Sequence, residues 1–161
     1  MADEDLLGDG FYKVTICTAL SSVSSPPAAQ LNAGVDIQSC VMRDGLQIEP
    51  NQEGADNSSL ASKGPTQRAG SPSYSINLLC KKKKLTIEDI AYNTLVPGMD
   101  VWLAVRRNRP NAEPWEAGDP AEIYPVQCGL RKPQQTQWNE VQKFLSTMFN
   151  YADADIDAVV A

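Results

Sequence analysis

The sequence predicts a mainly β fold: a sandwich or barrel of about seven or eight short strands, with one short helix packed on one side. Three observations lead to this prediction. Apolar and polar residues alternate along several short segments, which is the period of a strand with one buried face. The 11 prolines and 10 glycines divide the 161 residues into short segments. Only one segment shows clear helical spacing of its apolar residues.

The first third of the chain alternates between expected strands and turns. An N-terminal arm, Met1–Gly10, precedes a strand at Phe11–Leu20, in which Tyr12, Val14 and Ile16 share one face. Ser, Pro, Ala and Asn residues then predict a loop at 21–34. A second strand is expected at 35–43, and Asp44-Gly45 predicts a hairpin turn before a strand at 46–48.

The longest irregular stretch is Glu49–Pro72. It is rich in Gly, Pro, Asn and Ser, and Leu60 is its only large apolar residue. A loop of this length in a compact domain is either functional or disordered. Because it has too few apolar residues to pack on its own core, we expect it to become ordered against another molecule.

The second half returns to alternation after one helix. A strand is expected at 73–81, followed by a helix at 86–95 with Thr86 as its N-cap and Pro97-Gly98 as its stop signal. Further strands are expected at 101–107 and 121–130. Residues 138–149 fit a strand face and a helix stripe equally well. A small closing strand lies within the C-terminal arm, Tyr151–Ala161, so that the chain forms a single domain.

Composition argues against an enzyme and against a dedicated nucleic-acid binder. The chain has no histidine, so a Ser-His or Cys-His nucleophile cannot be built. It has no phosphate-binding glycine loop, and no spacing singles out a pair among its 20 Asp and Glu residues. The net charge of −6 lacks the basic excess typical of nucleic-acid binding. We therefore expect no catalytic residue and no cofactor.

The cysteines and the N-terminal sequence indicate the cellular compartment in which the protein is made. Cys17, Cys40, Cys80 and Cys128 are far apart in sequence and sit in apolar or alternating segments, which favours buried, reduced thiols over a zinc site. The acidic start of the chain does not resemble a signal peptide. No stretch approaches the roughly 18 apolar residues of a membrane span. We expect synthesis and assembly in a bacterial cytoplasm.

Three charged motifs allow more than one interpretation. Asp153, Asp155 and Asp157 alternate like the first ligands of a calcium loop, but the required Gly and Glu are missing, so an exposed acidic face is favoured over a metal site. The basic run Lys81–Lys84 has no interleaved aromatic residues, which favours a solvated strand end over nucleic-acid contact. Arg106, Arg107 and Arg109 could pair with acidic residues of a neighbouring subunit or face solvent.

Six segments between Leu95 and the C-terminus are more distinctive than the rest of the chain. They are LVPG at 95–98, VWLAVRR at 101–107, WEAGD at 115–119, EIYPVQCG at 122–129, NEVQKF at 139–144 and DAVVA at 157–161. Through these segments the C-terminal 70 or so residues resemble the tail tube proteins of long, flexible-tailed bacteriophages that infect actinobacteria. The first half of the chain fits only by strand order and the long loop.

The resemblance implies a β-sandwich subunit with a flanking helix and no active site. In that family six copies form a ring, and rings stack into the hollow tube through which the genome leaves the virion. Its implied partners are further copies of itself, the tape-measure protein, the tail terminator and the distal tail protein, with DNA passing through the lumen without specific binding. No membrane is involved.

The resemblance also implies that the N-terminal arm, the stretch 49–72 and the C-terminal arm make contacts between subunits and rings. The individual residues that we predict at such contacts are Phe11, Leu60, Lys63, Arg68, Arg106, Arg107, Trp115, Asp155, Asp157 and Val159.

Two other classes of function stay open at this point. One is another phage ring protein, such as a tail terminator, a head–tail joining protein or a decoration protein. The other is a monomeric β domain that binds single-stranded nucleic acid through Lys81–Lys84. A ring-forming subunit is expected to complete its exposed strand edges with neighbouring copies.

Overall fold

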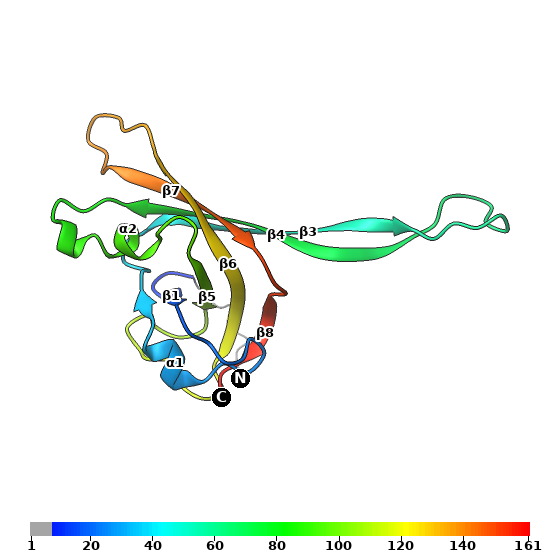
Figure 1. Ribbon diagram of the computed structural model, residues 1–161, viewed down its shortest axis with the longest axis horizontal. Helices are drawn as coiled ribbons and strands as arrows, with labels where there is room; N and C mark the ends of the chain where they lie inside the picture. The colour runs from blue at the N-terminus through cyan, green and yellow to red at the C-terminus, as the bar shows by residue number, and fades with distance from the viewer. Residues whose placement is uncertain (1–7) are drawn as a thin grey trace, which may run out of the picture.

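The computed structural model describes residues 8–161, and within this range eight strands form one antiparallel sheet (Figure 1). The prediction of a mainly β fold is confirmed. The order along the sheet is β2-β1-β5-β6-β7-β4-β3, and β8 pairs with β6. The strands are β1 (Lys13–Cys17), β2 (Val35–Asp36), β3 (Val41–Asp56), β4 (Gln67–Lys81), β5 (Asp100–Arg106), β6 (Pro120–Pro133), β7 (Lys143–Asn150) and β8 (Asp155–Val159).

The long strand β6 turns this single sheet into two facing layers. Its first half pairs with β5 and β8, and its second half pairs with β7, across a register shift between Cys128 and Arg131. A bulge of this kind bends a strand and increases its twist. The half-sheet β1-β5 is thereby folded over the half-sheet β7-β4, which gives the sandwich its two layers.

The main core lies between the two half-sheets. Val14, Leu103 and Tyr124 from one half pack in the same cluster as Leu78 and Phe144 from the other. Alternation is kept on β4, where Ile76, Leu78 and Cys80 are buried and the residues between them are half-buried. Helix α2 (Ile90–Thr94) adds Ala91 to the same cluster. Burial of this apolar surface is the main source of stability for the sandwich.

A second, smaller core covers the other face of β1, β5 and β6. Cys17, Ala104 and Ile123 pack there against Leu31 of helix α1 (Ala28–Asn32) and against Trp115. Strand β1 is therefore buried on both faces, and all five of its residues are buried. This second layer is the reason why a strand of alternating sequence has no solvent-facing side.

The hairpin of β3 and β4 extends far beyond the body of the molecule (Figure 1). Its strands pair from Leu46 and Leu78 out to Asp56 and Gln67, and the turn occupies residues 57–66. The prediction of an irregular loop at Glu49–Pro72 is therefore wrong for most of its length. The high content of Gly, Pro and Ser hid a two-stranded ribbon, whose strands are joined by backbone hydrogen bonds and which has no period-two apolar face to detect.

Two local predictions are also corrected. Asp44-Gly45 does not form a hairpin turn, because β3 runs through it with a register shift between Val41 and Leu46. A Cβ at Gly45 would collide with the backbone oxygen of Leu79, so glycine is required here by close approach of the neighbouring strand. Residues 21–34, predicted as a loop, contain the short helix α1.

The helix predicted at 86–95 is shorter and broken. A 3-10 turn, η1 (Thr86–Glu88), is followed by α2 at 90–94, and no side chain caps either element. The Thr86 cap is therefore wrong. Gly98, with a positive φ of 84°, lies beyond the helix end in the turn Val96–Met99, where the Met99 N–H donates to the Val96 oxygen at 3.2 Å. The ambiguous stretch at 138–149 becomes strand β7 from Lys143 onward, because its alternate residues pack into the main core.

Candidate subunit interface

The most prominent feature for contacts with other molecules is the outer part of the β3–β4 hairpin, residues 49–75, here called the arm. Every residue in it is exposed except Ser62, Gly70 and Tyr74, which are half-buried. Strand β7 pairs with β4 only from Ile76 onward, and β3 pairs only with β4. Both long edges of the arm therefore lack a neighbouring strand. An isolated two-stranded hairpin is marginally stable at best in water, so the arm favours a partner.

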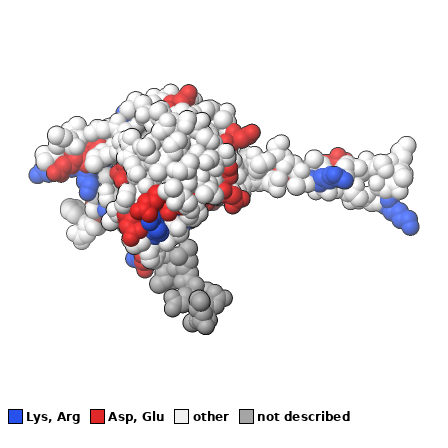
Figure 2. All heavy atoms as spheres, turned by 90° about the horizontal axis from the view of Figure 1, so that it is seen from below, with Lys and Arg blue, Asp and Glu red and all other residues white. Residues whose placement is uncertain are grey.

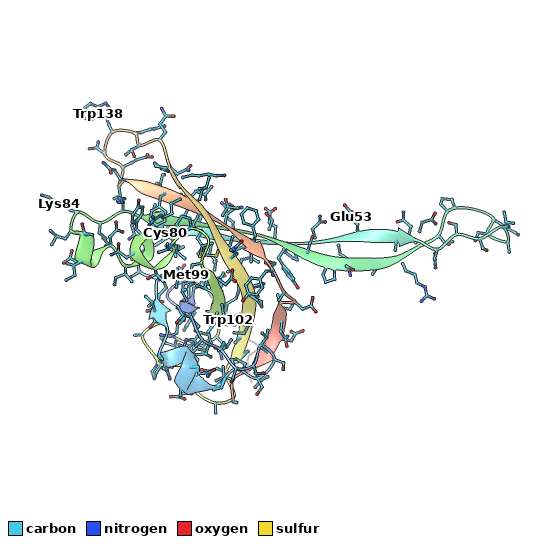
Figure 3. All side chains as sticks on the ribbon, in the orientation of Figure 1. Glu53, Cys80, Lys84, Met99, Trp102 and Trp138 are labelled. Atoms are coloured by element: carbon cyan, nitrogen blue, oxygen red, sulfur yellow. The ribbon has the colours of Figure 1, made fainter. Side chains whose placement is uncertain are left out.

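The base of the arm is anchored in the main core. The Tyr74 ring packs edge-on against the Tyr124 ring with centroids 5.4 Å apart, and Ile48 packs against the same core. Because both strands enter the core side by side, the direction in which the arm leaves the body is fixed by packing. Figure 3 shows Glu53 on the arm, well away from the body.

Prolines interrupt both free edges of the arm. Pro50 of β3 lies opposite Tyr74, and Pro72 of β4 lies opposite Gln52. A proline fits a ladder only where its nitrogen faces away from the partner strand, so both nitrogens face the outer edges. A further register shift lies between Gln52 and Gly54. These devices limit unspecific edge-to-edge aggregation and leave the faces and the tip of the arm for specific contacts.

The other edges of the sheet are short or covered within the subunit. Strand β2 has two residues. Strand β8 is bonded along its far side, where the Val159 N–H donates to the Ser24 oxygen and the Ala161 N–H donates to the Pro26 oxygen at 2.9 Å. The Asp157 N–H donates to the Asp155 side chain at 2.9 Å. Within residues 8–161, the arm therefore carries the longest edges without a partner.

The structure places three of the predicted contact residues on the outer part of the arm. Leu60 and Lys63 lie in the turn at its tip, where Leu60 is fully exposed at 109% of its reference area, and Arg68 is exposed on β4 opposite Ala55. No Asp or Glu lies between residues 57 and 75. Figure 2 shows the two basic side chains at separate positions along an arm that is otherwise mostly uncharged. The turn thus combines one apolar side chain with one positive charge, and the second positive charge lies farther back on β4.

The prediction that Arg106 contacts a neighbouring subunit is wrong. Its side chain is completely buried and lies 3.3 Å from the Asp119 carboxylate. Its guanidinium also donates to the backbone oxygens of Pro110, Glu113 and Pro114 at 2.8–3.0 Å. The Nε has no partner among residues 8–161, but the bonds made by Nη1 and Nη2 offset the cost of burying the charge and hold the 107–119 loop against the sheet.

Two neighbouring arginines are paired within the subunit as well. The Arg107 Nε donates to Glu122 at 2.6 Å, and the Arg107 guanidinium lies 5.0 Å from the centre of the Tyr12 ring. Arg109 pairs with Asp119 at 3.1 Å and with Glu116 at 3.0 Å. Because Arg107 is only half-buried, its position at a subunit contact stays a prediction.

Trp115 is also internal, so its predicted interface role is wrong. Only 2% of it is exposed, and its Nε1 donates to the Thr15 hydroxyl at 3.0 Å. Its backbone exchanges two hydrogen bonds with the Asn32 side chain, at 2.8 and 2.9 Å. The tryptophan therefore joins the 107–119 loop to α1 and the second core.

The remaining predicted residues lie on the surface. Asp157 and Val159 are exposed on β8, and Asp155 is half-buried there. Phe11 is half-buried ahead of β1. Of the predicted N-terminal arm, residues 1–7 lie outside the described residues. The C-terminal arm makes its described contacts within its own subunit, through β8 and β6, so a role between subunits stays a prediction for its exposed side chains.

The fold assembles one cluster that the sequence did not reveal, here called the basic end. Lys81 pairs directly with Lys143 across β4 and β7, and Lys132 pairs with Leu145 across β6 and β7. The run at 81–84 therefore does not stand alone. Only strand pairing shows this, since its members are up to 62 positions apart in sequence. The basic end consists of Lys81, Lys82, Lys83, Lys84, Arg131, Lys132 and Lys143.

The cysteines and the acidic residues do not form a reactive site. All four cysteines are free and buried, as predicted. Burial raises the pKa of the Cys17 thiol to about 11 and that of Cys80 to about 12, so both are protonated and unreactive at neutral pH. Among residues 8–161, no group of His, Cys, Asp and Glu side chains is arranged to hold a metal ion.

The comparison with protein families decides the identity of the fold. The family model described as phage tail tube protein matches residues 1–161. The chain belongs to the phage tail tube protein family. The resemblance seen in the C-terminal segments therefore extends over the whole chain.

A solved structure supports the same fold. A chain in the virion of a native gene transfer agent particle is similar, with a TM-score of 0.54 and 15% identity over 92% of this chain and 95% of that chain. At this identity the likeness shows the fold alone. The comparison with curated proteins finds no match. As a tail tube family member the protein is a structural component of a virion tail and not an enzyme. Across residues 8–161, no helix is long and apolar enough to cross a membrane.

Proposed function

We propose that this tail tube family member assembles into rings of six copies, and that the rings stack into the hollow tube of a long, flexible phage tail. Genomic DNA passes through this tube during ejection into the host. The tape-measure protein, the tail terminator and the distal tail protein of the same phage are its other partners. Synthesis and assembly take place in the cytoplasm of the host bacterium, an actinobacterium according to the sequence resemblance.

The observation that carries the proposal is the contrast between covered and uncovered strand edges. β8 is bonded on both sides within the subunit and β2 is two residues long, whereas the arm has two long edges and no apolar face of its own. Unpaired edges and an unsupported ribbon are costly for a monomer and useful in an assembly. Neighbouring copies supply the missing contacts.

Strand direction is compatible with ring closure. The half-sheet from which the arm extends contributes four consecutive antiparallel strands, β6, β7, β4 and β3. An even number of strands per copy means that rotation about a ring axis places oppositely running strands side by side at each junction. The arm then extends beyond its own copy. Contacts between stacked rings are heterologous and do not close, so they extend as a filament.

Electron microscopy of the purified wild-type protein tests the proposal. We expect rings and hollow filaments in negative stain, with six-fold symmetry in class averages and a lumen wide enough for a DNA duplex. Analytical ultracentrifugation over a range of concentrations gives an independent measure of assembly. A single monomeric species at the highest concentration, with no ring or filament on the grid, refutes the proposal.

A further inference from the structure

The basic end concentrates positive charge in one small part of an acidic protein. It contains seven of the 14 Lys and Arg residues, while only three of the 20 Asp and Glu residues, namely Glu88, Asp89 and Glu140, lie on the adjoining segments. The rest of the chain carries seven basic and 17 acidic residues, three of the latter within residues 1–7. Figure 2 shows acidic side chains distributed over the body.

Part of the basic end is held in place by an aromatic ring. The Lys82 Nζ lies 3.3 Å from the centre of the Tyr92 ring and 3.6 Å from Asp89, whose side chain is buried. The Arg131 guanidinium lies 3.9 Å from the centre of the same ring and donates to the backbone oxygen of Tyr92 at 2.7 Å. Cation–π contacts of this kind orient the two charges.

The other charges of the basic end have no counter-ion among residues 8–161. Lys83, Lys84 and Lys132 are exposed, and none of them forms an ion pair within residues 8–161. Lys81 and Lys143 face each other as direct cross-strand partners. Like charges placed directly opposite each other destabilise a strand pair. A free subunit gains nothing from this arrangement, so the uncompensated charge points to an acidic partner.

An exposed tryptophan adjoins the basic end. The loop between β6 and β7 starts after Lys132 and ends at Lys143, both of which belong to the basic end. The Gln134 N–H donates to the Lys143 oxygen at 3.0 Å and joins the two ends of the loop. Trp138 in this loop is 96% exposed and Val141 is 55% exposed. Figure 3 shows Trp138 and Lys84 at the end of the molecule opposite the arm. Tryptophan is among the residues that contribute most to protein–protein binding energy.

The charge is distributed unevenly along strand β6. Lys132 lies at its C-terminal end, whereas its N-terminal end pairs with β8, which carries Asp155 and Asp157. Lys132 is 9 to 12 residues from the positions that pair with β8, which is roughly 30–40 Å along the strand at about 3.3 Å per residue and less in space because β6 bends. A subunit with opposite charges at its two ends is attracted to a second copy in the same orientation and repelled by one in the reverse orientation.

We propose that the basic end, with Trp138, docks onto the acidic surface of a second copy of this chain and sets the polarity of stacking. This inference rests on the proposed function and names the surface and the partner that the stacking contact uses. The acidic excess of the remaining chain supplies the complementary charge at every step of growth. Association is therefore expected to weaken as salt screens the charges.

A protein partner fits these observations better than nucleic acid does. The cavity of about 560 Å³ near β1 and β3 and the groove on the arm are both lined by other residues. The charges of the basic end project from strand ends and do not follow a groove that would track a phosphate backbone. Nucleic acid is therefore the alternative that the experiment must separate.

The test reverses the three unpaired charges in the full-length protein, as Lys83→Glu, Lys84→Glu and Lys132→Glu combined. We expect rings to form and their stacking rate, followed by light scattering and microscopy, to fall by roughly tenfold or more at low salt. Trp138→Ala is expected to slow stacking without changing its salt dependence. Arg43→Glu is the matched control, since Arg43 is an exposed basic residue outside the basic end and its pair with Asp9 is almost fully exposed.

Three outcomes are decisive. Stacking of the triple variant at the wild-type rate, with a normal circular dichroism spectrum, overturns the inference and leaves the proposed function intact. Salt-sensitive binding of the wild type to single-stranded or duplex DNA, lost in a triple variant that still stacks normally, also overturns it and assigns the basic end to nucleic acid. Failure of the wild type itself to form rings refutes the proposed function and the inference together.

Discussion

The arm and the body of this tail tube family member follow opposite physical rules. In the body, β1 is buried on both faces and two apolar cores lie on either side of one half-sheet. In the arm, 24 of 27 residues are exposed. Its strands are held by backbone hydrogen bonds, a few side-chain hydrogen bonds such as Gln52 Nε2 to the Gly70 oxygen at 2.6 Å, and the anchoring Tyr74. The body has two cores with which to fold alone, whereas the arm has none, which is why we propose that another copy completes it.

The contrast also appears in how each region treats charge. The body neutralises its buried charges internally, as Arg106 does with Asp119 and three backbone oxygens. On the arm, Lys63 and Arg68 are exposed and form no ion pair within residues 8–161. Internal pairing stabilises a subunit, while unpaired exposed charge favours association with an oppositely charged surface. Mutations in the body should therefore change the free energy of unfolding, and mutations in the arm should change assembly.

The largest expected effect separates folding from assembly. Replacing Gln52–Pro72 with Asn-Gly joins Asn51 to Ser73, which are cross-strand partners, through a favoured hairpin turn. The free energy of unfolding should change by less than about 1 kcal/mol, because the deleted residues are exposed. Tube formation should be lost. Urea titration and negative-stain microscopy measure the two effects, and normal tubes from the shortened chain would contradict the role given to the arm.

Removal of the buried guanidinium should strongly destabilise the body. Arg106→Met leaves the Asp119 carboxylate buried with fewer partners and frees three backbone oxygens, so a loss of about 3–5 kcal/mol is expected. Arg109→Met is the matched control, since Arg109 also pairs with Asp119 but is partly exposed, and a smaller loss is expected. Equal losses for the two variants in urea denaturation would show that burial of Arg106 is not the deciding factor.

Apolar truncation should distinguish the two regions more finely. Ile123→Ala in the second core should cost about 2–5 kcal/mol, because the side chain is completely buried. Leu60→Ala at the tip should stay within about 0.5 kcal/mol in the free subunit. Thermal and urea unfolding of both variants check this. A large loss from Leu60→Ala would mean that the tip packs against its own body.

Hydrogen exchange should detect the smallest difference. In the free subunit, amides of the arm are expected to exchange faster than those of β5 and β6, because the hairpin opens without unfolding a core. On assembly the arm should become protected while β5 and β6 change little. Exchange in the arm that is the same before and after assembly would argue that it stays free of contacts in the tube.

Sequence patterns were reliable wherever one face of an element met a core. Alternation placed β5 and most of β6, and it found the part of β4 that lies in the body, because Ile76, Leu103 and Ile123 must all point inward. Patterns failed where backbone or buried polar groups decide the structure. The arm has no apolar period to detect, and the burial of Arg106 and Trp115 depends on a loop that folds back over the sheet.

The amino-acid sequence is sufficient to predict a β-rich subunit without catalytic groups and to recognise the family likeness of its C-terminal strands. Both depend on local composition and on period-two burial, which a linear chain displays directly. Three features follow only from the three-dimensional pairing of strands: which edges are covered, the ribbon at 49–72, and the position of Lys81–Lys84 beside Lys132 and Lys143. These features arise from pairing between distant strands, and the register of such pairing is set by the packing of the whole sheet.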